Sequence, residues 1–210
     1  MVALTRPEGS QPEDFAATRR GALGGLFFAG YAVAGRSAEA APITTDSTGL
    51  ATAEVAIPQR DGPLPAYLAR PARPGGRSPV VIVISEVFGV HAYIKDVCRR
   101  LAKLGYVAVA PDFFQRAGDP APLESFAEIQ KIVETATNEQ VMGDLAATLG
   151  WLRAQRFVDP RRIAVTGFCW GGAAAWMAVD RFPDFKAGVA WYGRLTAPKP
   201  GTFLGDEVRP

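Results

Sequence analysis

The chain has 210 residues, of which 48% are hydrophobic and 21% charged, and its 23 basic and 21 acidic side chains leave a net charge of +2. This length suits one domain, since domains usually run to about 100–200 residues, and the apolar fraction is enough for a sizeable core. No basic patch is visible, which argues against a nucleic-acid partner. Cys98 and Cys169 are too few for a disulfide framework and lack metal-ligand spacing.

The N-terminal region has the three parts of an export signal. A pair of arginines at 19–20 precedes an apolar stretch over 22–34, and a small-residue pattern, Ala-Glu-Ala, follows at 38–40. Paired arginines are typical of the twin-arginine route, and the apolar stretch is shorter than the roughly 20 residues that span a bilayer. We therefore predict a signal peptide over 1–40, export to the periplasm or beyond the cell, and no stable membrane anchor. A short anchor or a disordered tail is the alternative.

From Thr52 onward the chain alternates strand-like and helix-like runs. Continuous β-branched runs such as PVVIVI predict strands buried on both faces of a parallel sheet, and apolar residues at near-helical spacing predict helices. The expected strands are 52–57, 66–70, 79–84, 106–110, 162–166 and 186–191. The expected helices are 92–104, 123–135, 139–155 and 171–182. Turns are expected at 59–63 and at Asp159-Pro160, and residues 194–210 are expected to be loop.

This alternation predicts an α/β fold with a mostly parallel sheet, right-handed crossovers and helices on both faces. No internal repeat and no second domain is visible in the sequence. Residues 41–210 are therefore expected to form one domain.

A candidate nucleophile follows the fifth expected strand. The sequence Gly167-Phe168-Cys169-Trp170-Gly171-Gly172 is a G-x-nucleophile-x-G pattern with cysteine in the place of serine. Such a strand-to-helix turn presents its central residue from a strained, exposed position, and glycines at both sides avoid collisions across the turn. The N-terminus of the following helix favours a thiolate, and the Trp170 N–H is placed to form half of an oxyanion hole. The alternative is a buried structural cysteine.

Four segments together resemble the dienelactone hydrolase (carboxymethylenebutenolidase) family, over roughly Val55 to Tyr192. They are Ser85–Val90 (SEVFGV), Gly105–Asp112 (GYVAVAPD), Gly167–Gly172 (GFCWGG) and Trp191–Gly193 (WYG). The resemblance implies an α/β-hydrolase fold. It also implies hydrolysis of a small ester or lactone by a Cys-His-Asp triad, without metal or cofactor. The oligomeric state is not predicted.

The resemblance also assigns roles to individual residues. It implies that Cys169 is the nucleophile and that the N–H groups of Val87 and Trp170 bind the oxyanion. It implies that Glu86 is the carboxylate that helps control thiol ionisation. Phe88 and Tyr192 are the implied substrate-binding residues. A carboxylate at the end of an apolar strand is costly unless it is paired, which suits Glu86; a solvated strand-end carboxylate is the alternative. Asp112 matches the family as a turn residue without a catalytic role. A substrate-binding arginine of some members has no counterpart in residues 117–140, where Lys131 is the only basic residue.

The remaining triad members have no candidate where they are expected. The chain order in α/β-hydrolases is nucleophile, acid, histidine, yet residues 170–210 contain no histidine, and His91 is the only one in the sequence. His91 is adjacent to the segment 85–90 and could approach Cys169, but a helix-start histidine without a catalytic role is the favoured alternative. The acidic residues after the nucleophile are Asp180, Asp184, Asp206 and Glu207.

We therefore expect this chain to be the N-terminal portion of a longer hydrolase, with an incomplete, C-terminally truncated sheet. Hydrolytic turnover needs a proton donor for the leaving group and an activated water, so it should be severely weakened. The alternatives are a non-catalytic protein that binds small molecules in the same pocket and a thiol-reactive protein that uses Cys169.

Overall fold

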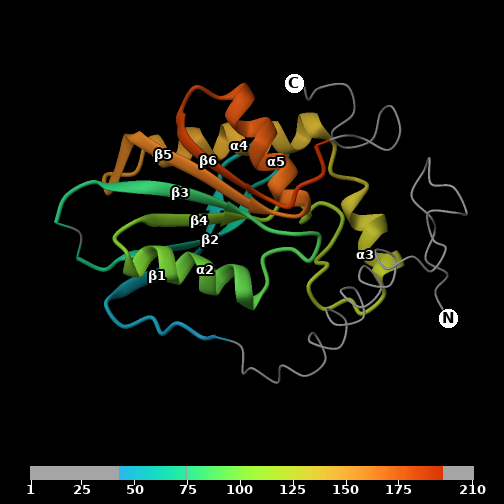
Figure 1. Ribbon diagram of the computed structural model, residues 1–210, viewed down its shortest axis with the longest axis horizontal. Helices are drawn as coiled ribbons and strands as arrows, with labels where there is room; N and C mark the ends of the chain where they lie inside the picture. The colour runs from blue at the N-terminus through green and yellow to red at the C-terminus, as the bar shows by residue number, and fades with distance from the viewer. Residues whose placement is uncertain (1–42, 74, 196–210) are drawn as a thin grey trace, which may run out of the picture. The chain divides into compact units, whose positions relative to one another are not determined.

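The computed structural model describes residues 43–73 and 75–195 (Figure 1). The predicted signal peptide and the last part of the tail, including Asp206 and Glu207, lie outside these residues. The strands are β1 Leu50–Ile57, β2 Leu64–Pro71, β3 Ser78–Ile84, β4 Val107–Pro111, β5 Val158–Phe168 and β6 Phe185–Trp191. The helices are α2 Ala92–Lys103, α3 Phe126–Val133, α4 Asn138–Arg153 and α5 Trp170–Arg181.

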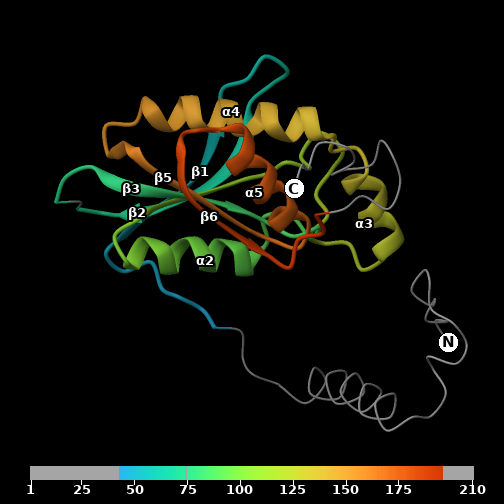
Figure 2. The same cartoon turned by 45° about the horizontal axis from the view of Figure 1, so that its top comes forward.

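The strands form one sheet in the order β1-β2-β4-β3-β5-β6. The four strands β3 to β6 run parallel to one another, whereas β1 and β2 form an antiparallel hairpin that pairs antiparallel with β4. Helix α2 covers one face of the sheet, and α4 and α5 cover the other (Figure 2). The predicted mostly parallel sheet with helices on both faces is confirmed.

Side chains of β3 alternate between two hydrophobic cores. Val80, Ile82 and Ile84 belong to the core beneath α4 and α5, while Val81 and Val83 belong to the core beneath α2. All five are buried, which explains why this strand reads as an uninterrupted apolar run rather than as an alternating one.

Cys98 lies in the α2 core and is fully buried, as its place on the apolar face of the predicted helix suggests. Burial raises the pKa of the Cys98 thiol, because the thiolate would lose its hydration. Of the two cysteines, Cys98 therefore has the properties of a core residue.

The predicted elements differ most from the structure at the strand near Asp159-Pro160 and at the helix over 123–135. The expected turn at Asp159-Pro160 lies inside β5. Ser78 of β3 pairs with Val158 of β5, and Val80 pairs with Ile163, so β5 has more residues than β3 between these two pairs. The extra residues form an irregularity held by the Asp159 carboxylate, which accepts a hydrogen bond from the Arg161 N–H at 3.1 Å. Helix α3 is shorter than predicted because Ser125 still has extended backbone, so the helix begins at Phe126.

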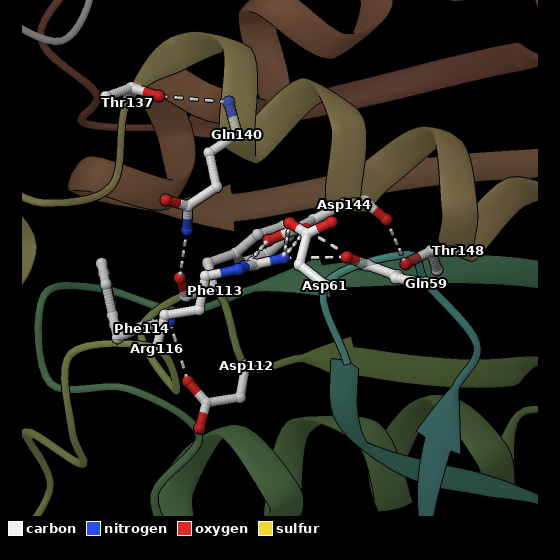
Figure 3. A network of polar contacts seen from close by, with 10 residues as sticks. All are labelled: Gln59, Asp61, Asp112, Phe113, Phe114, Arg116, Thr137, Gln140, Asp144 and Thr148. Atoms are coloured by element: carbon white, nitrogen blue, oxygen red, sulfur yellow. Dashed lines mark hydrogen bonds and ion pairs between the residues drawn. The ribbon is translucent and has the colours of Figure 1, made fainter. Parts of the chain in front are cut away.

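An ion pair between the solvent-accessible Arg116 and the buried Asp144 joins the loop after β4 to α4 (Figure 3). The Arg116 guanidinium donates to both carboxylate oxygens of Asp144, each at 2.9 Å. Gln59, in the β1–β2 hairpin, accepts from Arg116 at 2.8 Å and donates to Asp144 at 2.9 Å. The Asp144 side chain is 2% exposed, so its charge depends on these donors. The same loop is held by a hydrogen bond from the Gln140 amide to the Phe113 carbonyl at 3.2 Å.

Removing Arg116 should destabilise the fold, because it leaves the buried Asp144 carboxylate without its cationic partner. We expect Arg116→Met to lower the free energy of unfolding by about 1–3 kcal/mol or more, and the double variant with Asp144→Leu to recover much of that loss. Urea denaturation measures both. Glu54→Gln, which removes the more exposed ion pair with Lys95, is the control and should cost under about 1 kcal/mol. Equal effects of Arg116→Met and Glu54→Gln would contradict this account.

Candidate active site at Cys169

The parallel strands bring the predicted site residues to one edge of the sheet. Pairing of β3 with β5 ends at Ile84 and Gly167, and pairing of β5 with β6 ends at Phe168 and Trp191. The residues that follow these strands are therefore neighbours at the carboxyl edge, where open α/β sheets bind ligands. Glu86, Cys169 and Tyr192 all emerge there.

Cys169 has the backbone conformation of a strained turn between β5 and α5. Its φ is 54° and its ψ is −117°, a region that residues with a side chain rarely adopt. The Cys169 N–H donates to the Trp191 carbonyl at 3.0 Å, and its own carbonyl accepts from the Gly172 N–H at 2.9 Å in the first turn of α5. The predicted strand-turn-helix context is thus confirmed, and Cys169 is partly exposed.

Three glycines allow this turn to pack against both neighbouring strand ends. A Cβ on Gly167 would lie 1.9 Å from the Gly171 carbonyl oxygen, so the collision predicted across the turn is real. A Cβ on Gly171 would lie 2.3 Å from the Ser85 carbonyl oxygen, and one on Gly172 would lie 2.4 Å from that of Trp191. The start of α5 is therefore seated between the ends of β3 and β6.

Glu86, the carboxylate predicted beside the thiol, is paired rather than solvated. His91 Nε2 lies 3.1 Å from Glu86 Oε2, and the Glu86 side chain is 14% exposed. His91 is also the N-cap of α2, where its Nδ1 accepts from the Tyr93 N–H at 3.3 Å. Among the described residues no contact joins His91 to Cys169, so the helix-start interpretation of this histidine is the one that agrees with the structure.

Tyr192 and Phe88 supply aromatic surface from the segments after β6 and β3. Tyr192 has a φ of 40° and is 71% exposed. Partial burial nevertheless raises the pKa of its hydroxyl, and the charges of Glu86 and Cys169 raise it further, so both groups lie within electrostatic range of the Tyr192 hydroxyl. Phe88 is exposed and its ring stands edge-on to His91.

The two predicted oxyanion donors occupy different elements. Trp170 is the first residue of α5, and its buried ring packs on Phe114 and Phe113 at centroid distances of 4.8 and 6.0 Å. Val87 lies in the segment after β3 and packs against the same core. Because Phe113 and Phe114 belong to the loop anchored by Arg116, the Arg116–Asp144 ion pair also supports the residue that follows Cys169.

The acidic residues after the nucleophile do not assemble a triad in the described part of the chain. Asp180 is exposed, and Asp184 forms an ion pair with Arg153. Asp112 behaves as the predicted turn residue, since its carboxylate accepts from the Phe114 N–H at 3.1 Å. Burial raises the pKa of the Asp112 carboxyl. Residues 43–73 and 75–195 contain no group of three His, Cys, Asp or Glu side chains that could hold a metal ion.

Arg116 is the residue that the sequence analysis overlooked. It lies shortly after the Pro111-Asp112 turn and one position before residues 117–140, the range in which a substrate-binding arginine was expected. The signal that identifies it is its position between this turn and the next helix. In the structure its guanidinium is occupied by Asp144 and Gln59.

Comparison with known proteins finds a matching family and several similar proteins. Residues 64–205 match the dienelactone hydrolase family. A curated Methylorubrum extorquens protein, provisionally named a carboxymethylenebutenolidase, is 45% identical over 180 residues, which cover 85% of this chain and 62% of that protein. A similarly named Escherichia coli K12 protein is 40% identical and is covered to 63%, with 81% of this chain aligned.

A solved structure extends the similarity to three dimensions. The crystal structure of a Klebsiella pneumoniae protein, provisionally named a dienelactone hydrolase, superposes with a TM-score of 0.68 at 41% identity. The superposition covers 71% of this chain and 62% of that one. The fold is therefore that of the α/β-hydrolases, and the chain spans about three fifths of the length of these relatives.

The packing of the turn predicts a sharp contrast between two helical glycines. Gly171→Ala must displace the backbone of β3 and should cost about 1–3 kcal/mol of unfolding free energy or more, with altered accessibility of Cys169. Gly150→Ala, on an open face of α4 with nothing within 4 Å of the added Cβ, should instead stabilise by up to about 1 kcal/mol. Thermal unfolding and thiol labelling measure the two effects. A Gly171→Ala protein as stable and as reactive as the parent would refute the packing argument.

Proposed function

Because this chain belongs to the dienelactone hydrolase family, we propose that it is a carboxylic ester or lactone hydrolase with Cys169 as its nucleophile. One observation carries the proposal: Cys169 holds a left-handed backbone conformation at the carboxyl edge of the sheet and opens α5. A strained nucleophile at a helix N-terminus has its attacking atom exposed and its anionic form favoured.

The first half of the proposed reaction forms an acyl-enzyme. The Cys169 thiolate attacks the carbonyl carbon of the ester, and the N–H groups of Val87 and Trp170 hold the developing oxyanion. The carbon–oxygen bond of the ester then breaks, the leaving alkoxide takes up a proton from solvent water, and the acyl group remains on sulfur. Glu86 regulates thiol ionisation, and Phe88 and Tyr192 contact the bound substrate, for which their exposed rings favour small apolar or aromatic esters.

The second half requires water to attack the thioester, and that step needs a base. The only histidine of the 210 residues is engaged with Glu86. We place the triad acid and histidine in the two fifths of the relatives' length that these residues do not cover. On this proposal the 210-residue chain acylates at Cys169 but releases the acyl group slowly.

A burst experiment tests the proposal. With 4-nitrophenyl acetate, the chain should release about one equivalent of nitrophenolate quickly and then turn over slowly, and peptide mass spectrometry should find the acetyl group on Cys169. Cys169→Ala should abolish the burst, whereas Cys98→Ala should keep it because Cys98 is buried in the α2 core.

Two other outcomes would decide against it. A burst that survives in Cys169→Ala excludes Cys169 as the nucleophile. Rapid alkylation of Cys169 without any acyl transfer identifies the chain as a thiol-reactive protein, and ligand binding with neither reaction identifies a non-catalytic binding protein.

We further propose that the chain is exported through its N-terminal segment. The pattern of residues 1–40 carries this proposal, and no helix of the described residues is long and apolar enough to cross a membrane. Residues 1–40 fused to a folded reporter should deliver it to the periplasm, and replacing both Arg19 and Arg20 with lysine should abolish delivery. A reporter that stays in the cytoplasm with the unchanged segment would exclude this route.

A further inference from the structure

The two ring nitrogens of His91 have different and complementary partners. Nδ1 faces the Tyr93 backbone N–H at 3.3 Å, which can only donate, so Nδ1 must carry a lone pair. Nε2 faces the Glu86 carboxylate at 3.1 Å, and an ionised carboxylate can only accept, so Nε2 must carry the proton. Both contacts are satisfied by one neutral form of the imidazole, the one protonated at Nε2.

The surroundings of His91 fix the ring as well as its protonation. The His91 N–H donates to the Gly89 carbonyl at 3.0 Å, and its carbonyl accepts from the Lys95 N–H at 3.1 Å. The ring stacks on Tyr93 at a centroid distance of 6.3 Å and meets the edge of Phe88 at 6.5 Å. A donor held this way offers Glu86 a single direction for its hydrogen bond.

We infer that His91 is a positioning residue that holds the Glu86 carboxylate at the edge of the sheet where Cys169 also emerges. The inference rests on the proposed role of Cys169 as nucleophile. In this arrangement the histidine contacts the carboxylate rather than the thiol, and the Nε2–H fixes where the Glu86 carboxylate lies. A negative charge held near the thiol opposes its ionisation in the resting protein. His91 thus acts on Cys169 through Glu86.

Other ionisable groups border this corner and define the controls. Tyr93 and Lys95 lie on α2, Asp112 follows β4, and Tyr192 follows β6. Lys95 is already paired with Glu54 at 2.6 Å. Neither Tyr192 nor Asp112 forms a hydrogen bond with Glu86 in the described structure, so His91 is the direct partner of this carboxylate.

Asparagine at position 91 separates the two contacts of the histidine. Its side-chain oxygen can accept the Tyr93 N–H as a helix N-cap, but its shorter side chain has no donor at the position of Nε2. His91→Asn should therefore keep α2 and lose only the contact with Glu86. Thermal unfolding close to that of the parent verifies this.

The rate of Cys169 alkylation by iodoacetamide, followed against pH on the full chain, is the functional readout. We expect Glu86→Gln to speed labelling near neutral pH, and His91→Asn to speed it in the same direction by roughly tenfold. The double variant should label no faster than Glu86→Gln alone, because both changes remove the same effect. Unchanged or slower labelling in His91→Asn, or effects that multiply in the double variant, would overturn the inference.

A second readout does not depend on Cys169 chemistry. Since the chain has one histidine, the imidazole ¹⁵N resonances of untagged protein belong to His91 alone. They should show the Nε2-protonated form, and Glu86→Gln should shift the Nε2–H resonance. An Nδ1-protonated ring, or one averaging between both forms, would refute the positioning role even if Cys169 is reactive. An unreactive Cys169 with the expected ¹⁵N pattern would instead refute the proposed function and leave the His91–Glu86 contact standing.

Discussion

The contact between the first turn of α5 and the ends of two strands is the constraint on which the site depends. Gly171 lies against the Ser85 carbonyl and Gly172 against that of Trp191, at distances that exclude any side chain. The segments after β3 and β6 therefore lie close to the start of α5, and Cys169, which directly precedes this helix, has a positive φ of 54°. Backbone strain of this kind persists only where the surrounding packing over-determines it, and here two strands and a helix do so.

Two carboxylates near the Cys169 turn, those of Asp144 and Glu86, have different surroundings. Beneath the turn, Asp144 is buried and fully engaged by Arg116 and Gln59, which anchors the loop carrying Phe113 and Phe114 under Trp170. At the site itself, Glu86 keeps some solvent access and has a neutral partner in His91. A neutral donor binds a carboxylate without cancelling its charge, and the Glu86 charge adds to the effect of burial in raising the pKa of Tyr192.

Much of this architecture could be predicted from the sequence because its signals are local. The PVVIVI run, the Gly105 that follows the end of α2 and the glycines around Cys169 each reflect a requirement of the backbone within a few residues. The Arg116–Asp144 and Asp184–Arg153 contacts join residues about 28 and 31 positions apart, and no sequence pattern specifies which charges will meet. The irregularity at Asp159 was anticipated as a turn, but its location inside β5 depends on pairing with β3.

The contact between His91 and Glu86 could not be predicted from the sequence either, although the two residues are close along the chain. His91 is five positions from Glu86, yet its rotamer and protonation follow from the geometry of the α2 N-terminus, which composition does not reveal.

The central claim is that Cys169 faces a site whose oxyanion donors are the N–H groups of Val87 and Trp170. A crystal structure of the chain alkylated at Cys169 with iodoacetamide would test this most directly. The account predicts the carboxamide oxygen within hydrogen-bonding distance, about 2.7–3.2 Å, of both N–H groups; an adduct whose oxygen points to solvent, or a Cys169 that the reagent cannot reach, would contradict it.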